Sequence, residues 1–193
     1  MEDFRSIKVT VREDRKPGQT RLVISNPTSL KLIGQGAQGA VFELSSNRCV
    51  KIYAKPNSAE RERKALEAGG PHFFMPQLYE TGKNYIIMEL IQGPDLGQYL
   101  DELGEVPKRV VKQVMQIFDS MKKIGFSRID MRLRHILVTK EEKLKVVDHV
   151  NAFSAKSEVP AKLLKDLKKK KLLKPFLKKV KKIDPKTYEL WKG

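Results

Sequence analysis

The chain has 193 residues, of which 40% are hydrophobic and 32% charged, and its net charge is +16, a balance that suits one globular domain with its own core. No run of about 18 apolar residues is present, which argues against a membrane-spanning helix. Cys49 is the only cysteine, which excludes an internal disulfide and argues against a cysteine-based zinc site. The sequence does not begin with a basic region followed by an apolar stretch, as a secretory signal would, so we expect a cytoplasmic protein.

The first half of the chain has the pattern of β-strands. Alternating or densely apolar segments predict strands at residues 7–11, 21–25, 30–34, 40–44, 50–53 and 85–91. A stretch rich in Glu, Arg, Ala and Leu predicts a helix at 59–68, which ends at Gly69-Gly70.

The second half has the pattern of helices. A helix is predicted to begin at Pro107, and its apolar residues form one continuous stripe from Val110 to Met121. Two short strands follow at 136–139 and 144–147, and the Lys/Leu-rich remainder predicts helix that is interrupted at Pro175. Strands followed by helices favour a two-lobed α+β arrangement over an alternating βαβ sheet.

A glycine-rich segment lies between two of the predicted strands. Residues 34–41 read Gly-Gln-Gly-Ala-Gln-Gly-Ala-Val, the pattern G-x-G-x-x-G-x-V. Glycines allow a backbone to turn tightly and to approach phosphate oxygens closely. In a dinucleotide-binding fold this pattern would open a helix, whereas the residues after Gly39 have the pattern of a strand. The context therefore predicts a phosphate-binding loop between strands, with Val41 packing on an adenine base.

Lys51 lies in the next predicted strand, where its ammonium group could reach the phosphates of a nucleotide bound at the loop. The alternative is an ordinary exposed lysine at a strand edge. A phosphate-binding lysine needs an acidic partner, and the following helix offers Glu60, Glu62 and Glu67. We select Glu62, because Leu66 follows it at the spacing typical of an anchoring glutamate. The other two glutamates are expected to pair with neighbouring Arg and Lys residues at the surface.

With these motifs, the segment from about residue 30 to residue 150 resembles the protein-kinase superfamily. The resemblance implies that ATP is bound between two lobes, that Met88 is the gatekeeper beside the adenine, and that the backbone of Glu89 and Ile91 forms hydrogen bonds with the base. The residues that it assigns to nucleotide binding are Ile33, Gly34, Gly36, Gly39, Val41, Lys51, Glu62, Met88, Glu89 and Ile91.

The stretch that begins at Asp130 resembles the kinase catalytic loop. The resemblance implies that Asp130 accepts the proton of the acceptor hydroxyl or orients that hydroxyl. It also implies that Arg132 supports the transferred γ-phosphate, while Lys51 reaches the α- and β-phosphates. His135 stands where the family has an Asn that binds a second magnesium ion. Asp148 lies 13 residues later, at the usual spacing of the metal-binding Asp, and a carboxylate suits Mg²⁺.

The chain departs from the kinase pattern at several positions. Because imidazole prefers transition metals, either His135 takes the metal-binding role, with Mn²⁺ as an alternative to Mg²⁺, or the site uses only the ion held by Asp148. A third possibility is that His135 only forms hydrogen bonds near Asp130. His149 replaces the Phe of the Asp-Phe-Gly motif, and Arg128 precedes Ile129 where His-Arg is usual. Regulation by a flip of that Phe or by activation-loop phosphorylation is therefore not expected.

Together these features predict a single protein-kinase-like domain over residues 1–193, with an N-terminal lobe at 1–90, a catalytic lobe at 91–160 and a basic helical segment at 161–193. The short second lobe resembles minimal atypical kinases: the RIO-type kinases, the bacterial sugar-core kinases and short bacterial serine/threonine kinase-like proteins. Arg134-His135-Ile136 in the catalytic loop favours the last group. The predicted activity is ATP-dependent phosphate transfer to a protein Ser or Thr. The alternatives are a kinase for a sugar or antibiotic and a pseudokinase that serves as an interaction module.

The basic segment has 13 lysines and three acidic residues, a net charge of +10. One interpretation is that its helices complete the second lobe and that the lysines form their solvated face. The other is attachment to nucleic acid or to an anionic membrane surface through charge. Aromatic residues suited to base stacking are few in this segment: Phe176, Tyr188 and Trp191.

Overall fold

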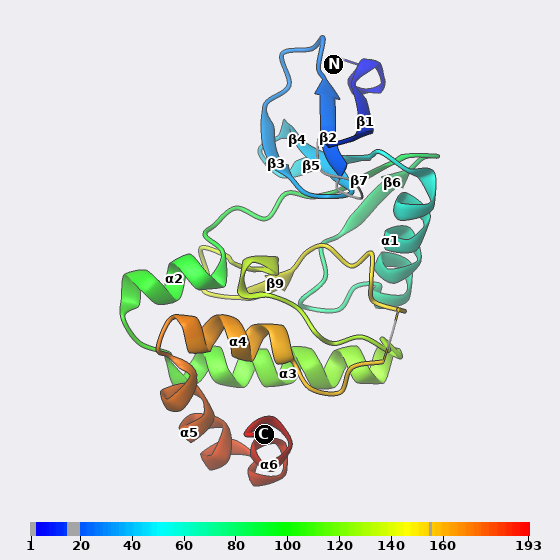
Figure 1. Cartoon of the computed structure of the whole chain (residues 1–193). Helices are drawn as coiled ribbons and strands as arrows, with labels where there is room; N and C mark the ends of the chain where they lie inside the picture. Colours follow the sequence, from blue (N-terminus) through cyan, green and yellow to red (C-terminus); the bar gives the residue numbers. More distant parts are fainter. Residues whose placement is uncertain (1–2, 15–19, 155) are drawn as a thin grey trace. The chain divides into compact units, whose positions relative to one another are not determined.

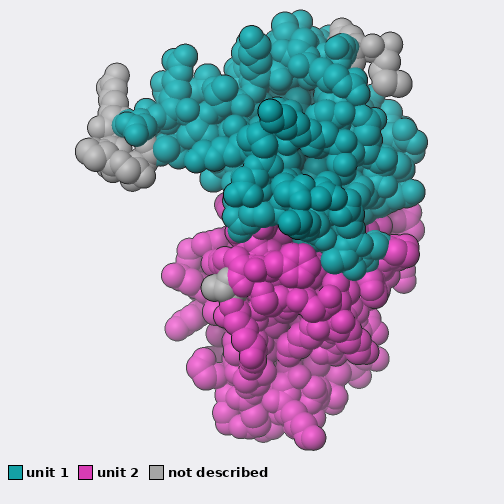
Figure 2. Space-filling model, turned by 90° about the vertical axis from the view of Figure 1, so that its right-hand side faces the viewer, with its two compact units in different colours: residues 1–70, 76–90 teal, residues 71–75, 91–193 magenta. Residues whose placement is uncertain are grey.

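The computed structural model describes residues 3–14, 20–154 and 156–193. The chain divides into two compact units, coloured separately in Figure 2. The first unit comprises Met1–Gly70 and Pro76–Leu90, and the second comprises Pro71–Met75 and Ile91–Gly193. The first is rich in strands and the second in helices, so the fold is α+β and kinase-like, as the order of the predicted elements indicated.

Two antiparallel sheets form most of the first unit. Strands β1 and β2 pair with each other, and the larger sheet has the order β3-β4-β5-β7-β6 (Figure 1). The strands are β1 Lys8–Glu13, β2 Thr20–Ser25, β3 Leu32–Gln35, β4 Gly39–Ser45, β5 Arg48–Tyr53, β6 Leu78–Thr81 and β7 Tyr85–Glu89. All of them except β6 coincide with predicted strands.

Helix α1 (Pro56–Gly69) has one buried face, which carries a charged residue. It begins three residues earlier than predicted, because Pro56 lies in its first turn. Backbone N–H groups in a first turn have no partner within the helix, so a proline there costs no hydrogen bond. Ala59, Glu62 and Ala65 lie on this face at helical spacing, together with Leu66. Glu62 is therefore turned into the interior of the first unit.

Helices and one short strand pair form the second unit. The elements are α2 Leu96–Leu103, α3 Lys108–Ile124, the 3-10 helix η2 Leu133–His135, β8 Ile136–Val138, β9 Leu144–Val146, α4 Ala161–Lys169, α5 Leu173–Ile183 and α6 Pro185–Trp191. The apolar stripe predicted for α3 is buried from Val110 to Met121. Within the described parts of the chain, no helix has both the length and the apolar character that crossing a membrane requires.

The prediction of a helix break at Pro175 is wrong. Pro175 is the third residue of α5, within the first turn, where backbone N–H groups have no partner inside the helix. The breaks lie instead between α4 and α5, where Lys171 has a left-handed backbone with φ of 61°, and at Asp184. The Asp184 side chain accepts hydrogen bonds from the first backbone N–H groups of α6 and so caps that helix.

Candidate active site

The candidate residues form two groups, one in each unit. In the first unit, the glycine-rich loop joins β3 to β4, with Gly34 opposite Val41 in the strand register. The backbone N–H of Gly36 donates to the carbonyl of Gly39 at 3.0 Å and closes the turn. A Cβ at Gly39 would lie 2.4 Å from the carbonyl oxygen of Ile52, so only glycine fits there. A Cβ at Gly36 would meet no atom within 4 Å, so this part of the loop faces open space.

Lys51 and Glu62 form a buried ion pair beside this loop. Lys51 lies on β5 opposite Val41, and its Nζ is 2.6 Å from Glu62 Oε2. The side chains are 10% and 1% exposed, respectively. The hydroxyl of Tyr53 donates to the same Glu62 oxygen at 2.6 Å, and its ring faces the Lys51 ammonium at 5.2 Å. The structure thus brings together the pair that the sequence selected.

The residues that the resemblance assigns to the adenine have varied environments. Ile33 is exposed, Val41 is half-buried, and Met88 and Ile91 are buried. The backbone N–H of Glu89 donates to the carbonyl of Gln77 at 2.8 Å, so the chain itself uses this donor. Their roles toward a base stay predictions.

In the second unit, Asp130 contacts the beginning of α4. Its Oδ1 accepts a hydrogen bond from the backbone N–H of Lys162 at 2.7 Å, and its Oδ2 lies 3.2 Å from the Lys162 ammonium. The guanidinium of Arg128 is 3.9 Å from the same Oδ2. The Asp130 side chain is 11% exposed, so α4 covers much of it.

Arg132 also contacts α4. Its guanidinium lies 3.1 Å from Asp166 Oδ1, and the backbone N–H of Leu133 donates to Asp166 Oδ2 at 3.4 Å. Lys162 and Asp166 are four residues apart, so they lie on one face of the helix. The catalytic-loop segment and α4 are therefore joined by two ion pairs of opposite polarity.

His135 and Asp148 lie near each other. The Nε2 of His135 is 3.8 Å from Asp148 Oδ2, and the backbone N–H of Val147 donates to the His135 carbonyl at 2.9 Å. Asp148 has φ of 67°, a left-handed conformation that is uncommon for a residue with a side chain and that clusters at functional sites. Its side chain is 44% exposed.

His149 lies in the interior rather than in the candidate site. Its Nε2 is 2.9 Å from the carbonyl oxygen of Val146, which requires the ring to donate there, and its ring centroid lies 5.9 Å from that of Phe126. The residue is 5% exposed.

The second unit offers a modest set of metal donors. Among the described residues, no group of three or more His, Cys, Asp or Glu side chains is placed to hold an ion. Asp148 with His135 supplies one carboxylate and one imidazole. Magnesium commonly binds one or two carboxylates and takes its other ligands from water and phosphate, so the donor set fits a nucleotide-bound ion better than a closed structural site.

Sequence reasoning did not identify three of the residues described above: Tyr53, Lys162 and Asp166. Tyr53 follows Lys51 by two residues on one strand, so strand alternation could have placed both on one face. Lys162 and Asp166 lie more than 30 residues after their partners among many similar lysines. No local signal distinguishes them.

The α+β fold, the glycine loop with its buried lysine–glutamate pair, and the Asp130 and Asp148 segments define a protein-kinase-like domain. The model of the family described as ABC1 atypical kinase-like domain matches residues 54–182, more than half of the chain, and the chain belongs to this family. The match includes Glu62, Asp130 and Asp148, while the glycine loop and Lys51 precede it. The resemblance to the RIO-type kinases stays a prediction.

One curated relative was found in Bacillus subtilis (strain 168), named "Putative serine/threonine-protein kinase YrzF". It is 26% identical over 139 residues, which cover 69% of this chain. The aligned region spans 65% of that relative's own length.

Proposed function

We propose that the protein is an ATP-dependent phosphotransferase that transfers the γ-phosphate to a Ser or Thr hydroxyl of a protein. The observation that carries the proposal is the buried Lys51–Glu62 pair beside the glycine loop. Burying two charges costs free energy through desolvation, and apolar residues would stabilise a core at least as well. A charged pair at this position is explained if the lysine has an anion to bind.

In this proposal the first unit binds the nucleotide. The loop backbone and the Lys51 ammonium face the phosphates, and Glu62 and Tyr53 keep that ammonium in place. Val41 and Ile33 offer apolar contacts for the base. The open space at Gly36 and the close backbone approach at Gly39 support this assignment.

The second unit acts on the acceptor. The Asp130 carboxylate orients the acceptor hydroxyl and takes its proton. The bond between the γ-phosphorus and the bridging oxygen to the β-phosphate breaks, a bond from the acceptor oxygen to that phosphorus forms, and ADP leaves. Asp148, with His135 beside it, would hold a magnesium or manganese ion, which when bound neutralises charge on the phosphates.

Two observations support a protein acceptor. The relative in Bacillus subtilis carries a serine/threonine-protein kinase name. Lysines also dominate the exposed surface of α4 to α6, which favours acceptors with acidic surroundings over a neutral sugar.

The test is incubation of the purified chain with γ-labelled ATP and Mg²⁺ or Mn²⁺, using casein and the chain itself as acceptors. We expect label on Ser or Thr that is reduced at least 100-fold by Lys51→Ala, Asp130→Ala and Asp148→Ala. The matched control is Asp119→Asn, which changes an exposed acidic residue of α3 and should keep wild-type labelling. Labelling that is equal in all four variants would contradict the assignment of the site.

His135→Asn tests the metal assignment separately. If His135 is a ligand, the ratio of the rates with Mg²⁺ and Mn²⁺ should shift toward Mg²⁺, because an amide oxygen is a harder donor than an imidazole. An unchanged ratio would remove His135 from the metal site.

One observation favours a second function, a nucleotide-binding domain that transfers no phosphate. Asp130 is largely covered by α4, which restricts access to its carboxylate. Binding of ATP without transfer to any protein, to the chain itself or to water would support this alternative.

A further inference from the structure

We propose that helix α4 belongs to the catalytic apparatus and that Lys162 is the positioning residue for Asp130. This inference rests on the function proposed above. The resemblance assigns the basic residue of the catalytic loop to Arg132, which lies two residues after Asp130. In the structure, however, the guanidinium of Arg132 is paired with Asp166, and the cation closest to Asp130 comes from α4.

Lys162 holds Asp130 at both carboxylate oxygens. Its backbone N–H donates to Oδ1 at 2.7 Å, and its ammonium lies 3.2 Å from Oδ2. Two contacts from one residue fix both the position and the rotation of the carboxylate. A group that must accept a proton from a bound hydroxyl needs this kind of fixed orientation, since small displacements of reacting groups slow a reaction strongly.

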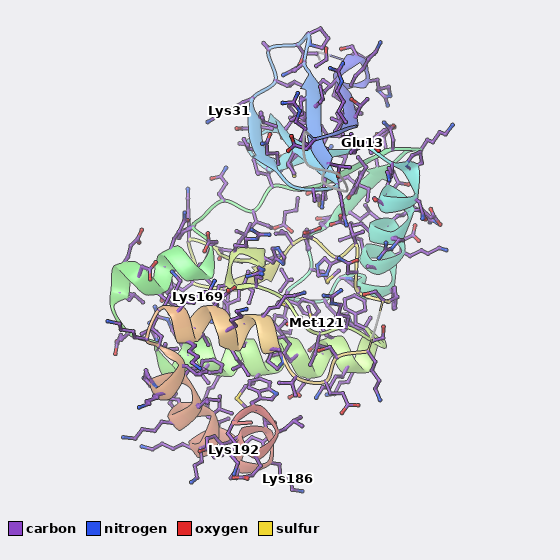
Figure 3. All side chains as sticks on the ribbon, viewed as in Figure 1. Glu13, Lys31, Met121, Lys169, Lys186 and Lys192 are labelled. Carbon is purple, nitrogen blue, oxygen red and sulfur yellow. The ribbon has the colours of Figure 1, made fainter. Side chains whose placement is uncertain are left out.

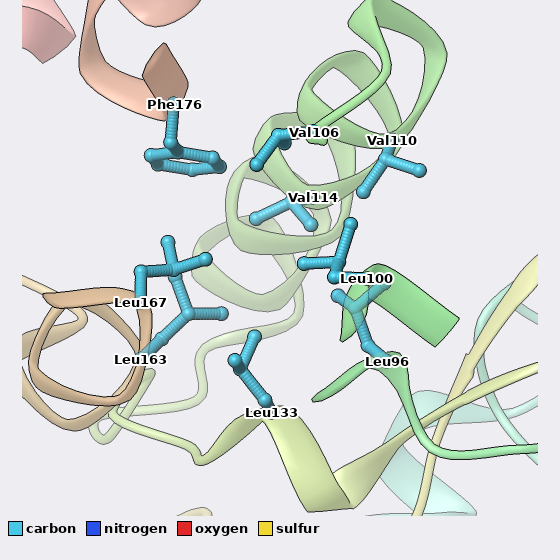
Figure 4. A pocket seen from close by; sticks show the side chains of 9 residues that line it. All are labelled: Leu96, Leu100, Val106, Val110, Val114, Leu133, Leu163, Leu167 and Phe176. Carbon is cyan, nitrogen blue, oxygen red and sulfur yellow. The ribbon is translucent and has the colours of Figure 1, made fainter. Parts of the chain in front are cut away.

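Helix α4 is anchored firmly enough to serve as a support. Its apolar residues Leu163 and Leu167 are 0% and 1% exposed. Figure 4 shows them lining an apolar pocket with Leu96 of α2, Val114 of α3 and Leu133 of the catalytic-loop segment. Because Leu133 follows Arg132 directly, this packing joins α4 to the catalytic loop through both apolar and ionic contacts. Such a helix is a fixed part of the second unit rather than a detachable cover.

The backbone of the catalytic-loop segment is held by the chain that precedes α4. The N–H of Arg128 donates to the carbonyl of Ala152 at 3.0 Å, and the N–H of Ser157 donates to the carbonyl of Ser127 at 2.9 Å. The stretch between β9 and α4 therefore runs alongside the residues that lead into Asp130. Together with α4, it supports the backbone of the residues that lead into Asp130.

The experiment compares Lys162→Met with Lys162→Arg and with Lys165→Met. Lys165 is an exposed lysine on the same helix and serves as the matched control. Turnover of γ-labelled ATP should fall about 10- to 100-fold in Lys162→Met, with a KM for ATP within about twofold of the wild type. Lys162→Arg should recover most of the loss, and Lys165→Met should equal the wild type. Circular dichroism and urea unfolding verify that each variant is folded.

A double variant separates positioning from general damage. If Lys162 acts through Asp130, adding Lys162→Met to Asp130→Asn should not lower the residual single-turnover rate further. An equal loss in both backgrounds would overturn the proposal. So would a rate that rises in Lys162→Met, because α4 would then be blocking Asp130.

The outcomes also distinguish this inference from the proposed function. If the wild type and Lys165→Met transfer phosphate and both Lys162 variants equal them, the inference is wrong and the proposed function stands. A wild type that transfers no phosphate to any protein or to water overturns both.

Discussion

Glu62 is held in an environment that normally excludes charge. It has a helix face of small and apolar residues around it, and it contacts the Lys51 ammonium and the Tyr53 hydroxyl. Removing one charge of such a pair leaves the other buried without compensation, whereas removing both leaves two neutral groups. This asymmetry can be measured without knowledge of the substrate.

We expect Lys51→Met and Glu62→Gln each to lower the free energy of unfolding by about 3–5 kcal/mol. The double variant should lose much less than the sum of the two single variants, because no uncompensated charge remains. Urea denaturation of the four proteins gives the coupling. Glu67→Gln is the control, since Glu67 pairs with Arg63 on the exposed face of the same helix, and it should leave the transition midpoint unchanged. Additive losses in the double variant would mean that the two side chains do not interact.

Cys49 should be chemically inert in the folded protein. Burial raises the pKa of its thiol from 9.0 to about 12, although nearby Lys51 acts in the opposite direction. At pH 8 the thiolate, the reactive species, is then about 1000-fold rarer than in the unfolded chain. Alkylation by iodoacetamide should be slower than in urea by at least that factor, and its rate should rise about tenfold per pH unit. Equal rates with and without urea would show that Cys49 is accessible.

Among the secondary-structure elements, helix α2 shows how local capping residues fix both ends of a short helix. Asp95 accepts a hydrogen bond from the backbone N–H of Gln98 at 3.1 Å, and the Gln98 side chain accepts one from the Asp95 N–H at 3.3 Å. This reciprocal capping box begins the helix, and Gly104, with φ of 66°, ends it.

Asp95→Ala should therefore destabilise the protein by about 1 kcal/mol. Thermal or urea unfolding measures this loss. Glu102→Ala, at an exposed position of the same helix, should leave the stability nearly unchanged. A loss of equal size in both variants would indicate that the cap contributes nothing beyond helix propensity.

The elements that sequence reasoning predicted are those with clear periodicity. The strands around the glycine loop and the apolar stripe of α3 were predicted at nearly their observed positions. Strand β6 was missed because it is a short edge strand without fully buried residues. Pro175 was read as a break because the rule against proline applies to a helix interior, whereas this residue lies in a first turn.

The same contrast applies to the candidate site. The Lys51–Glu62 pair could be chosen from sequence because both residues lie in adjacent, strongly patterned elements only 11 residues apart. The pairing of Asp130 with Lys162 joins residues 32 apart, with η2, β8 and β9 between them, and 13 lysines of the C-terminal segment were equivalent candidates. Such a contact is set by the packing of α4, which the lysine pattern does not encode.

For the molecule as a whole, the uneven distribution of charge matters most. Residues 161–193 contribute +10 of the net charge of +16. Their apolar residues are used in packing: Phe176 and Trp191 are buried, and their rings stack at 6.2 Å. The lysines lie outside, and Figure 3 labels three exposed ones, Lys169, Lys186 and Lys192. The helices therefore complete the second unit, and stacking on nucleic-acid bases by Phe176 or Trp191 is not available without unfolding.

We propose that this surface still binds anionic polymers through charge alone. A fluorescent DNA duplex of mixed sequence is the probe, and anisotropy is the measurement. Binding should be insensitive to sequence, and the logarithm of the binding constant should fall linearly with the logarithm of salt concentration, with a slope of about −0.9 for each phosphate contacted. Membrane attachment would appear instead as binding to vesicles of anionic lipid with no binding to the duplex.

The decisive variant changes the lysines at 168–171 to glutamine. Three of these lysines are exposed, and the fourth, Lys170, is paired with Asp101. The salt-dependence slope should therefore become less steep, by about 0.9 for each exposed lysine that contacts a phosphate. The matched control changes four exposed lysines elsewhere in the second unit, at positions 112, 122, 123 and 140. Since it removes the same charge, the control separates a localised surface from the effect of net charge. An equal loss of DNA affinity in the two variants would assign the binding to overall charge. An unchanged slope in the 168–171 variant would mean that these lysines are only the solvated face of helices that complete the fold.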